Sequence, residues 1–77
     1  MRDELKSYIE TDLLSGHEVE PGEELLLSGL VDSLGVMRLI AFIETRFGIR
    51  VPAGDMKLQN FRSIDAIATY LSTKADA

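Results

Sequence analysis

The sequence predicts an all-α fold: a small bundle of three main helices plus one short helix, with a long first loop. Apolar residues recur at three- and four-residue spacings in three separate segments, and this is the periodicity of an amphipathic helix. Only residues 49–52 alternate apolar residues as a short strand does, and no second segment could pair with them. A bundle of helices is therefore the expected architecture.

The first predicted helix covers residues 2–14. Its apolar face consists of Leu5, Tyr8, Ile9 and Leu13. Ser15-Gly16 is expected to end it in a left-handed conformation. Residues 15–32 then form a long connection, which is polar at first and apolar at the leucines 25–27. A loop this long in a small domain usually has a function or is held on the core, and the leucines favour the second.

The second predicted helix covers residues 33–47, and either Asp32 or Ser33 can cap it. Its apolar stripe consists of Val36, Leu39, Ile40, Ile43 and Phe47. Gly48 ends this helix, and residues 49–52 are extended because the residue before a proline avoids helix. Residues 55–60 predict a short helix or turn that contributes Met56 and Leu58. The last helix covers residues 63–72, is capped by Ser63, and buries Ile64, Ile67, Ala68 and Leu71.

Composition narrows the class of protein. The 77 residues predict a single domain spanning 1–77. The chain has no cysteine and one histidine, His17, so thiolate chemistry and multi-histidine metal sites are excluded. His17 with Glu18 and Glu20 is a poor candidate metal site, because the loop offers nothing rigid to fix coordination, and no metal is expected. No apolar run approaches a membrane span, and residues 1–10 do not resemble a secretory signal. A cytoplasmic protein is the default expectation.

Acidic residues gather in one part of the chain. The net charge is −5, and residues 10–24 contain six acids with no lysine or arginine. Such a chain repels phosphate backbones, so nucleic acid is not expected as a partner. This stretch is either a solvated loop or an electrostatic docking surface for a basic protein.

Ser33 is the residue most suited to covalent attachment of a group by another enzyme. It lies at the predicted start of a helix, where free N–H groups and the helix dipole favour an added phosphate. A hydrolytic serine would need an adjacent base, and the surrounding sequence is not G-x-S-x-G. A small hydrolase or transferase that uses Ser33 is thus the weakest alternative. A purely structural alternative is that Ser33 only caps the helix.

Three motifs together resemble one family. They are Gly29-Leu30-Val31-Asp32-Ser33-Leu34-Gly35, Phe47-Gly48-Ile49-Arg50-Val51-Pro52 and Ile64-Asp65-Ala66-Ile67. In this order and at these spacings they resemble an acyl or peptidyl carrier protein. A lone D-S-L triplet is a weak signal, and the second motif, at the end of the same helix, makes it specific. With Gly35 directly after Ser-Leu, the first motif resembles that of aminoacyl, D-alanyl and peptidyl carriers more than that of the fatty-acid type.

The resemblance implies a cofactor and partners. In the family the serine matching Ser33 is esterified by 4′-phosphopantetheine from coenzyme A, by a magnesium-dependent phosphopantetheinyl transferase. The thiol of this arm carries an acyl or aminoacyl group as a thioester, and the carrier itself is not an enzyme. The implied partners are the transferase, an ATP-dependent acyl or aminoacyl ligase and downstream acyl-acceptor enzymes. Tethering presents the cargo to them at high effective concentration.

Six residues are candidates for contacts with these partners: Asp32, Leu34, Met37, Arg38, Ala41 and Val51. The resemblance implies that Asp32 helps the transferase to recognise the site. Met37 is either adaptable binding surface or a boundary of the core, and Val51 either belongs to the core or borders a cargo cavity. Asp32, Arg38, Glu44 and Arg46 sum to zero charge. Partners therefore cannot recognise a strongly negative second helix, as is usual for fatty-acid-type carriers.

The alternative function is a non-catalytic helical adaptor that retains the carrier fold without a prosthetic arm. The chain begins near the first predicted helix and stops just past the last one. This favours a free-standing protein, with an excised module of a larger synthase as the alternative. Nothing in the sequence requires more than a monomer.

Overall fold

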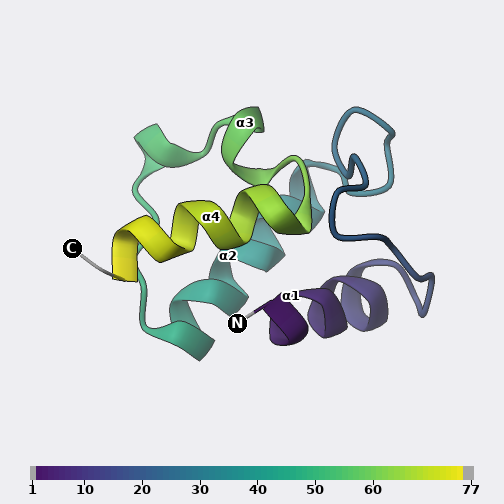
Figure 1. Ribbon diagram of the computed structural model, residues 1–77, viewed down its shortest axis with the longest axis horizontal. Helices are drawn as coiled ribbons and strands as arrows, with labels where there is room; N and C mark the ends of the chain where they lie inside the picture. The colour runs from purple at the N-terminus through teal and green to yellow at the C-terminus, as the bar shows by residue number, and fades with distance from the viewer. Residues whose placement is uncertain (1, 76–77) are drawn as a thin grey trace.

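The computed structural model describes residues 2–75, in which it has four α-helices and no strand. In chain order these are α1 (Arg2–Tyr8), α2 (Ser33–Phe47), α3 (Leu58–Phe61) and α4 (Ile64–Ala75). Figure 1 shows α4 in front of α2, α3 above α4, and α1 below them. The predicted all-α bundle of three main helices and one short helix is confirmed.

The first predicted helix is divided in two. After α1 the chain continues as a π-helical segment, η1 (Ile9–Leu13), in which the amide of Leu14 donates to the carbonyl of Ile9 at 3.0 Å. Ser15 and Gly16 both have positive φ, at 55° and 95°, so the expected left-handed ending is confirmed. Leu5 and Ile9 are fully buried. The apolar spacing thus located the buried face, but it could not foresee the wider last turn.

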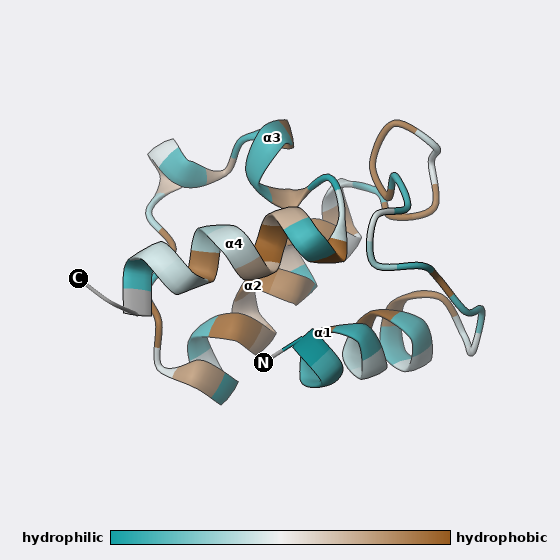
Figure 2. Cartoon of the chain, in the orientation of Figure 1, coloured by the Kyte–Doolittle hydropathy of each residue, from teal (hydrophilic) through white to brown (hydrophobic). Residues whose placement is uncertain are grey.

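The long loop is held on the core by backbone hydrogen bonds. The amide of Leu25 donates to the carbonyl of Arg62 at 2.7 Å, and the amide of Asp65 donates to the carbonyl of Pro21 at 2.9 Å. The Glu10 carboxylate accepts from the amide of Val19 at 2.8 Å. Of the three leucines only Leu25 is buried. Figure 2 shows that the loop is hydrophilic in its first part and hydrophobic later.

α2 has the predicted bounds. It ends at Gly48, whose φ of 67° places it in the left-handed region and whose amide donates to the carbonyl of Glu44 at 3.1 Å. Leu39, Ile40 and Ile43 are buried, while Val36 and Phe47 pack against the core at its edge. The apolar stripe therefore faces the interior, as predicted.

The segment between α2 and α4 differs from the prediction in one respect. A short 3-10 turn, η2 (Ala53–Asp55), comes before α3, so the expected short helix or turn is present. Met56 and Leu58, expected to contribute to packing, are 49% and 43% exposed, whereas Phe61 is buried. A four-residue helix has one inward face, and Phe61 occupies it.

α4 starts one residue later than predicted and continues to Ala75. Its cap is Ser63, whose hydroxyl accepts a hydrogen bond from the amide of Ala66 at 3.1 Å. The four predicted core residues of this helix, Ile64, Ile67, Ala68 and Leu71, are all buried. They join the buried residues of α1 and α2 in one core cluster. In residues 2–75, no helix is long and apolar enough to cross a membrane.

Candidate functional site

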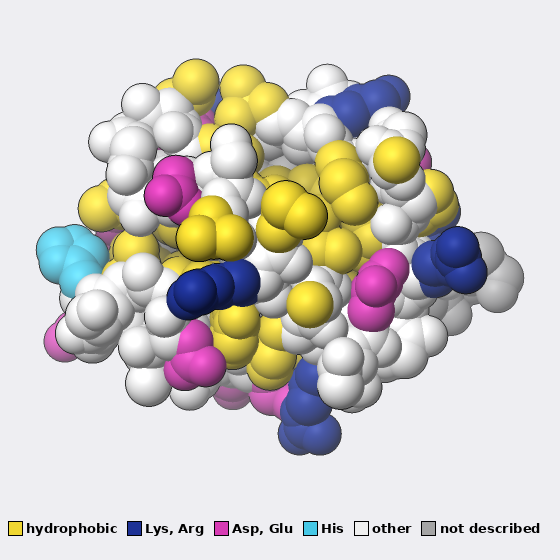
Figure 3. Space-filling model, turned by 180° about the vertical axis from the view of Figure 1, so that it is seen from behind, with side chains coloured by type: hydrophobic (Ala, Val, Ile, Leu, Met, Phe, Trp, Pro, Cys, Tyr) yellow, Lys and Arg dark blue, Asp and Glu magenta, His cyan; other side chains and the backbone are white. Residues whose placement is uncertain are grey.

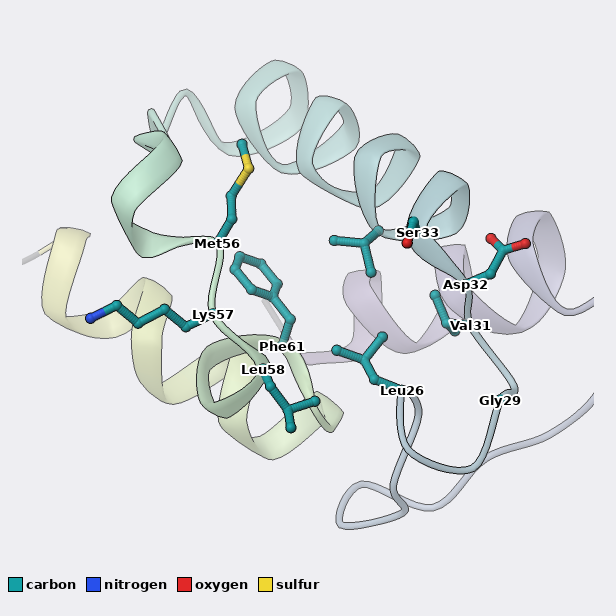
Figure 4. A pocket seen from close by; sticks show the side chains of 10 residues that line it. Leu26, Gly29, Val31, Asp32, Ser33, Met56, Lys57, Leu58 and Phe61 are labelled. Atoms are coloured by element: carbon teal, nitrogen blue, oxygen red, sulfur yellow. The ribbon is translucent and has the colours of Figure 1, made fainter.

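Ser33 is the first residue of α2, and the residue is exposed to solvent. The core residues of α2 begin at Leu39, six residues later. Figure 4 shows Ser33 at the end of the helix, next to Asp32 and beside a cleft. The hydroxyl is therefore accessible on a backbone that the rest of α2 anchors.

Asp32 is the residue that caps α2. Its backbone is extended, with φ of −95° and ψ of −176°, and its Oδ1 accepts a hydrogen bond from the amide of Gly35 at 2.8 Å. Its carbonyl accepts from the amide of Val36 at 2.9 Å. Of the two caps that the sequence allowed, the structure uses Asp32. The hydroxyl of Ser33 is not needed for this role.

A tight turn carries the chain into the helix. Gly29 has a φ of 81°, and its amide donates to the carbonyl of Leu26 at 3.1 Å. The Ser28 hydroxyl donates to the carbonyl of Glu24 at 2.5 Å. The amide of Val31 donates to the carbonyl of Leu25 at 2.9 Å. Two residues before Ser33, the backbone is thus fixed to the buried part of the loop.

An open cleft of about 510 Å³ lies beside Ser33, between the start of α2 and the segment that leads into α3. Figure 4 shows Phe61 and Leu26 pointing toward the middle of this cleft and Lys57 pointing away. Its apolar lining residues are Leu26, Val31, Val36, Met56, Leu58 and Phe61. Met56 and Leu58, which the sequence assigned to packing, line the cleft instead. Met56 precedes α3 and Leu58 is its first residue, and their exposure depends on packing that no local pattern indicates.

Four of the residues predicted to contact partners lie exposed on α2: Leu34, Met37, Arg38 and Ala41. The exposed fraction is 60% for Leu34 and 67% for Met37, and neighbouring exposed apolar side chains can form a patch that a partner covers. Asp32 is also exposed. The structure thus places the four exposed residues of α2 directly after Ser33 on the same helix, and Asp32 directly before it.

The structure corrects the prediction made for Val51. It is 4% exposed and belongs to the core cluster. Its amide donates to the Glu44 carboxylate at 3.0 Å, which holds the extended segment against α2. The prediction that Val51 contacts partners is therefore wrong for this conformation, because a buried side chain offers no surface. Of the two interpretations of Val51, membership of the core is confirmed.

Most charged groups of α2 already form hydrogen bonds or ion pairs within the fold. Glu44 accepts the amide of Val51, Arg46 pairs with Glu4, and Asp32 caps the helix. Arg38 is exposed, and no carboxylate of residues 2–75 lies within ion-pair distance of it. Of the two arginines of α2, Arg38 is thus the one without an ion pair among residues 2–75.

The site fits a group attached through a phosphodiester. The hydroxyl of Ser33 is accessible, and the positive end of a fifteen-residue helix lies at its position, where a phosphate is favoured. The adjacent Asp32 carboxylate is occupied by the amide of Gly35. The cleft beside Ser33 leaves open space for a flexible chain.

Comparison with known proteins gives a family. The phosphopantetheine attachment site family matches residues 3–71. No curated protein sequence gives a significant match. Among solved structures, the chain is similar to a chain in a crystal structure of an FAD-dependent dehydrogenase. The TM-score is 0.80 and the identity 26%, over 87% of this chain and 97% of that one.

Two further similar chains belong to complexes of Bradyrhizobium japonicum glycine:carrier protein ligase. One complex holds the cognate carrier protein and an analogue of glycyl adenylate; the similarity covers 94% of this chain and 91% of that one, with a TM-score of 0.71 and 20% identity. The other holds the glycylated carrier protein; the similarity covers 88% and 89%, with a TM-score of 0.68 and 22% identity. At these identities the two matches establish the shared fold.

The family match spans most of the chain, and the structure has the fold of a carrier protein. The cofactor of this family is 4′-phosphopantetheine, which is attached covalently to the domain. The chain belongs to the phosphopantetheine-binding carrier protein family.

Proposed function

We propose that Ser33 is the residue that carries 4′-phosphopantetheine, and that the protein tethers an acyl or aminoacyl group as a thioester on that arm. The observation that carries this proposal is the exposure of Ser33 at the fixed start of α2. The Asp32 cap and the anchored turn before it support the same assignment. A transferase needs an accessible hydroxyl in a constant position, and both conditions are met here.

The carrier domain positions the cargo, and its partner enzymes carry out the reactions on it. An arm anchored at Ser33 keeps the cargo within reach of each enzyme that docks on the domain, which raises its effective concentration. Carrier domains of this family are generally not catalytic. The expected partners are a phosphopantetheinyl transferase, an ATP-dependent ligase that loads the arm, and an acyl-acceptor enzyme.

An aminoacyl cargo loaded by such a ligase is the form of the proposal that the solved structures favour. Two of the similar chains are carriers in complex with an aminoacyl ligase, and one of them is glycylated. The exposed apolar residues of α2 next to Ser33 provide a surface on which a ligase could dock.

The test is the intact mass of the purified protein after incubation with coenzyme A, Mg²⁺ and a transferase of broad specificity. We expect a gain of one phosphopantetheine unit, which Ser33→Ala abolishes. Ser7→Ala, at an exposed serine on α1, is the matched control and should be modified like the wild type. Since Asp32 caps α2, circular dichroism should show that Ser33→Ala leaves the fold intact.

Two results would contradict the proposal. One is the absence of any gain with several transferases, and the other is an unchanged gain in Ser33→Ala. If the arm is never attached, yet partners bind wild type and Ser33→Ala equally, the protein is an adaptor without an arm. Labelling of Ser33 by a serine-directed phosphonate would instead indicate a hydrolase.

A further inference from the structure

A pair of oppositely charged side chains joins the two sides of the cleft beside Ser33. Nε of Arg62 lies 2.9 Å from Oε1 of Glu24, and Nη2 of Arg62 lies 2.8 Å from the same oxygen. Arg62 directly follows α3, whereas Glu24 belongs to the loop that leads into α2. The two residues are 38 positions apart in the chain, so the pair is a tertiary contact between these two segments.

A backbone hydrogen bond joins the same two segments. The amide of Leu25 donates to the carbonyl of Arg62 at 2.7 Å. Figure 4 shows Leu26, from the loop, and Phe61, from α3, pointing toward the middle of the cleft. Each of them is the chain neighbour of one partner in this hydrogen bond. We call Glu24, Leu25 and Arg62 the clamp, because their contacts fix the two sides of the cleft relative to each other.

Glu24 also organises the turn that precedes Ser33. Its Oε2 accepts a hydrogen bond from the amide of Leu27 at 3.3 Å. Its backbone carbonyl accepts a hydrogen bond from the Ser28 hydroxyl at 2.5 Å. One residue thus holds Arg62 with one carboxylate oxygen and the turn with the other oxygen and its carbonyl.

The clamp reaches the start of α2 through one further hydrogen bond. The amide of Val31 donates at 2.9 Å to the carbonyl of Leu25, the residue whose own amide is bound by Arg62. Val31 is buried and directly precedes Asp32, the cap of α2. Direct contacts therefore connect Arg62 with the residue before the cap, and loss of the ion pair should loosen the backbone that carries Ser33.

The ion pair is too open to water to contribute much to the stability of the whole fold. The exposed fraction is 52% for the side chain of Arg62 and 26% for that of Glu24. Ion pairs at such positions add little to the free energy of unfolding. A role in placing the turn can therefore be separated from a role in stability.

The face on which α2 lies gives a partner little electrostatic guidance. α2 is behind α4 in Figure 1, so it faces the viewer in Figure 3. Figure 3 shows positive and negative side chains interspersed around the hydrophobic ones on this face. Steering by charge is strongest where a surface carries one sign. A productive encounter with this face thus depends all the more on the placement of Ser33 in the free protein.

We propose that Glu24 and Arg62 are positioning residues for the transfer of phosphopantetheine to Ser33. The inference rests on the function proposed for Ser33. In that transfer the Ser33 oxygen bonds to the pantetheine-bearing phosphorus of coenzyme A, the phosphoanhydride bond breaks, adenosine bisphosphate leaves, and the serine proton passes to a base of the transferase. The clamp keeps the turn in the arrangement that the transferase binds. Without it only a fraction of the molecules has that arrangement, and the apparent affinity falls by the same fraction.

The first measurement is amide hydrogen exchange in the unmodified protein, which needs no transferase. Arg62→Gln and Glu24→Gln should each speed exchange at the amide of Val31 by at least about fivefold, because the turn opens more often. Exchange at the amide of Val51, which is bound by a carboxylate at the other end of α2, should stay at the wild-type rate. That reference separates local loosening from global unfolding.

Arg2→Gln is the matched control. The Arg2 guanidinium pairs with the Asp65 carboxylate, and its side chain is 55% exposed, close to the 52% of Arg62. The substitution removes the same charge from an ion pair outside the clamp, so exchange at Val31 should not change. All three single variants should lower Tm by about 3 °C or less.

The second measurement is KM and kcat of a transferase of broad specificity with each variant as substrate. Arg62→Gln and Glu24→Gln should each raise KM about fivefold with kcat near the wild type, because docking restores the turn at a cost in affinity. The double variant should be no worse than either single one, since both remove the same contact. The charge swap Glu24→Arg/Arg62→Glu should regain most of the loss, and Arg2→Gln should behave as the wild type.

The proposal is overturned if exchange at Val31 keeps its wild-type rate in both single variants, or if their KM values equal that of Arg2→Gln. Additive losses in the double variant, or a charge swap that regains nothing, would also overturn it. Such results would show that the two side chains act separately, as they would if Arg62 contacted the transferase directly. If the wild type never acquires the arm, the function of Ser33 is contradicted instead, and the exchange measurement alone decides whether the clamp holds the turn.

Discussion

The carboxylate of Asp32 accepts a hydrogen bond from the amide of Gly35 at 2.8 Å. These two residues lie before and after the residue proposed to carry the arm. This bond closes the first turn of α2 around Ser33. It also explains how the hydroxyl of Ser33 can be exposed while its backbone is fixed. The cap and the attachment site are therefore two neighbouring residues with separate roles.

The first prediction separates the two roles of Asp32. Asp32→Ala should lower the free energy of unfolding by about 1 kcal/mol, because the amide of Gly35 loses its acceptor. Asp32→Asn should cost only a few tenths of that, since asparagine caps helices as well as aspartate. Urea denaturation checks both values. If the transferase requires the negative charge, Asp32→Asn should slow the mass gain at Ser33 without a change in stability.

Gly35 is predicted to be required for space. A Cβ atom at this position would lie 2.9 Å from Cγ1 of Val31 and 3.4 Å from Oδ1 of Asp32. Alanine normally stabilises a helix relative to glycine, but this overlap with a buried valine should make Gly35→Ala destabilising by about 1 kcal/mol. Unfolding free energies of Gly35→Ala, Val31→Ala and the double variant test this. Purely additive effects would contradict the predicted clash.

A cluster on α4 predicts how stability depends on pH. The Tyr70 hydroxyl donates to Asp55 at 2.6 Å, and Lys74 pairs with the same carboxylate at 3.0 Å. Burial and then the hydrogen bond to Asp55 raise the pKa of Tyr70 from 10.0 to about 12. The hydrogen bond from Tyr70 and the Lys74 charge lower the pKa of Asp55 below its ordinary 3.8.

The two pKa shifts have opposite signs, so the two groups contribute to stability in different ranges of pH. The stabilisation from Tyr70 should be fully present below pH 10 and lost as the pH rises from 10 toward 12. The contribution of Asp55 should be present above about pH 4 and lost as the pH falls through its lowered pKa. Thermal unfolding of wild type and Tyr70→Phe across pH checks this. The variant should lose the Tyr70 contribution to the alkaline drop and unfold a few degrees earlier at pH 7. An alkaline drop of the same size in Tyr70→Phe would refute the assignment.

Glu10 is predicted to hold the first loop. Its carboxylate accepts the amide of Val19 at 2.8 Å and pairs with Lys6 at 3.2 Å. The hydrogen bond from Val19 lowers the pKa of Glu10 below its ordinary 4.5, so this contact should weaken as the pH falls below that range. Glu10→Ala should increase hydrogen exchange at the amide of Val19. Asp12→Ala, at a nearby exposed acid, should leave that amide protected.

Much of the fold and of the site could be predicted from periodicity and capping residues. The apolar spacings of α2 and α4 identified their buried faces, because a long helix has many positions that must agree. Ser33 could be located at a helix start because Asp32 and Gly48 mark the ends of α2. The π-helical turn at Ile9–Leu13 and the exposure of Met56 and Leu58 could not be predicted. They depend on packing between segments far apart in sequence.

The packing of α1 against α2 was also beyond sequence reasoning. The rings of Tyr8 and Phe42 stack although they lie thirty-four positions apart in the chain, and no local pattern indicates such a pair. The hydrogen bond between Val51 and Glu44 and the ion pair between Arg46 and Glu4 are likewise tertiary contacts. Net charge along α2 could be counted from the sequence, but which of these charges pair within the fold could not.

The most direct test of the central claim is to locate the attached group within the chain. Trypsin cleavage after Lys6 and Arg38 releases a peptide of residues 7–38, which contains Ser7, Ser15, Ser28 and Ser33. After incubation with coenzyme A and a transferase, tandem mass spectrometry of this peptide should place phosphopantetheine on Ser33. A modification on any of the other three serines, or an unmodified peptide, would contradict the account.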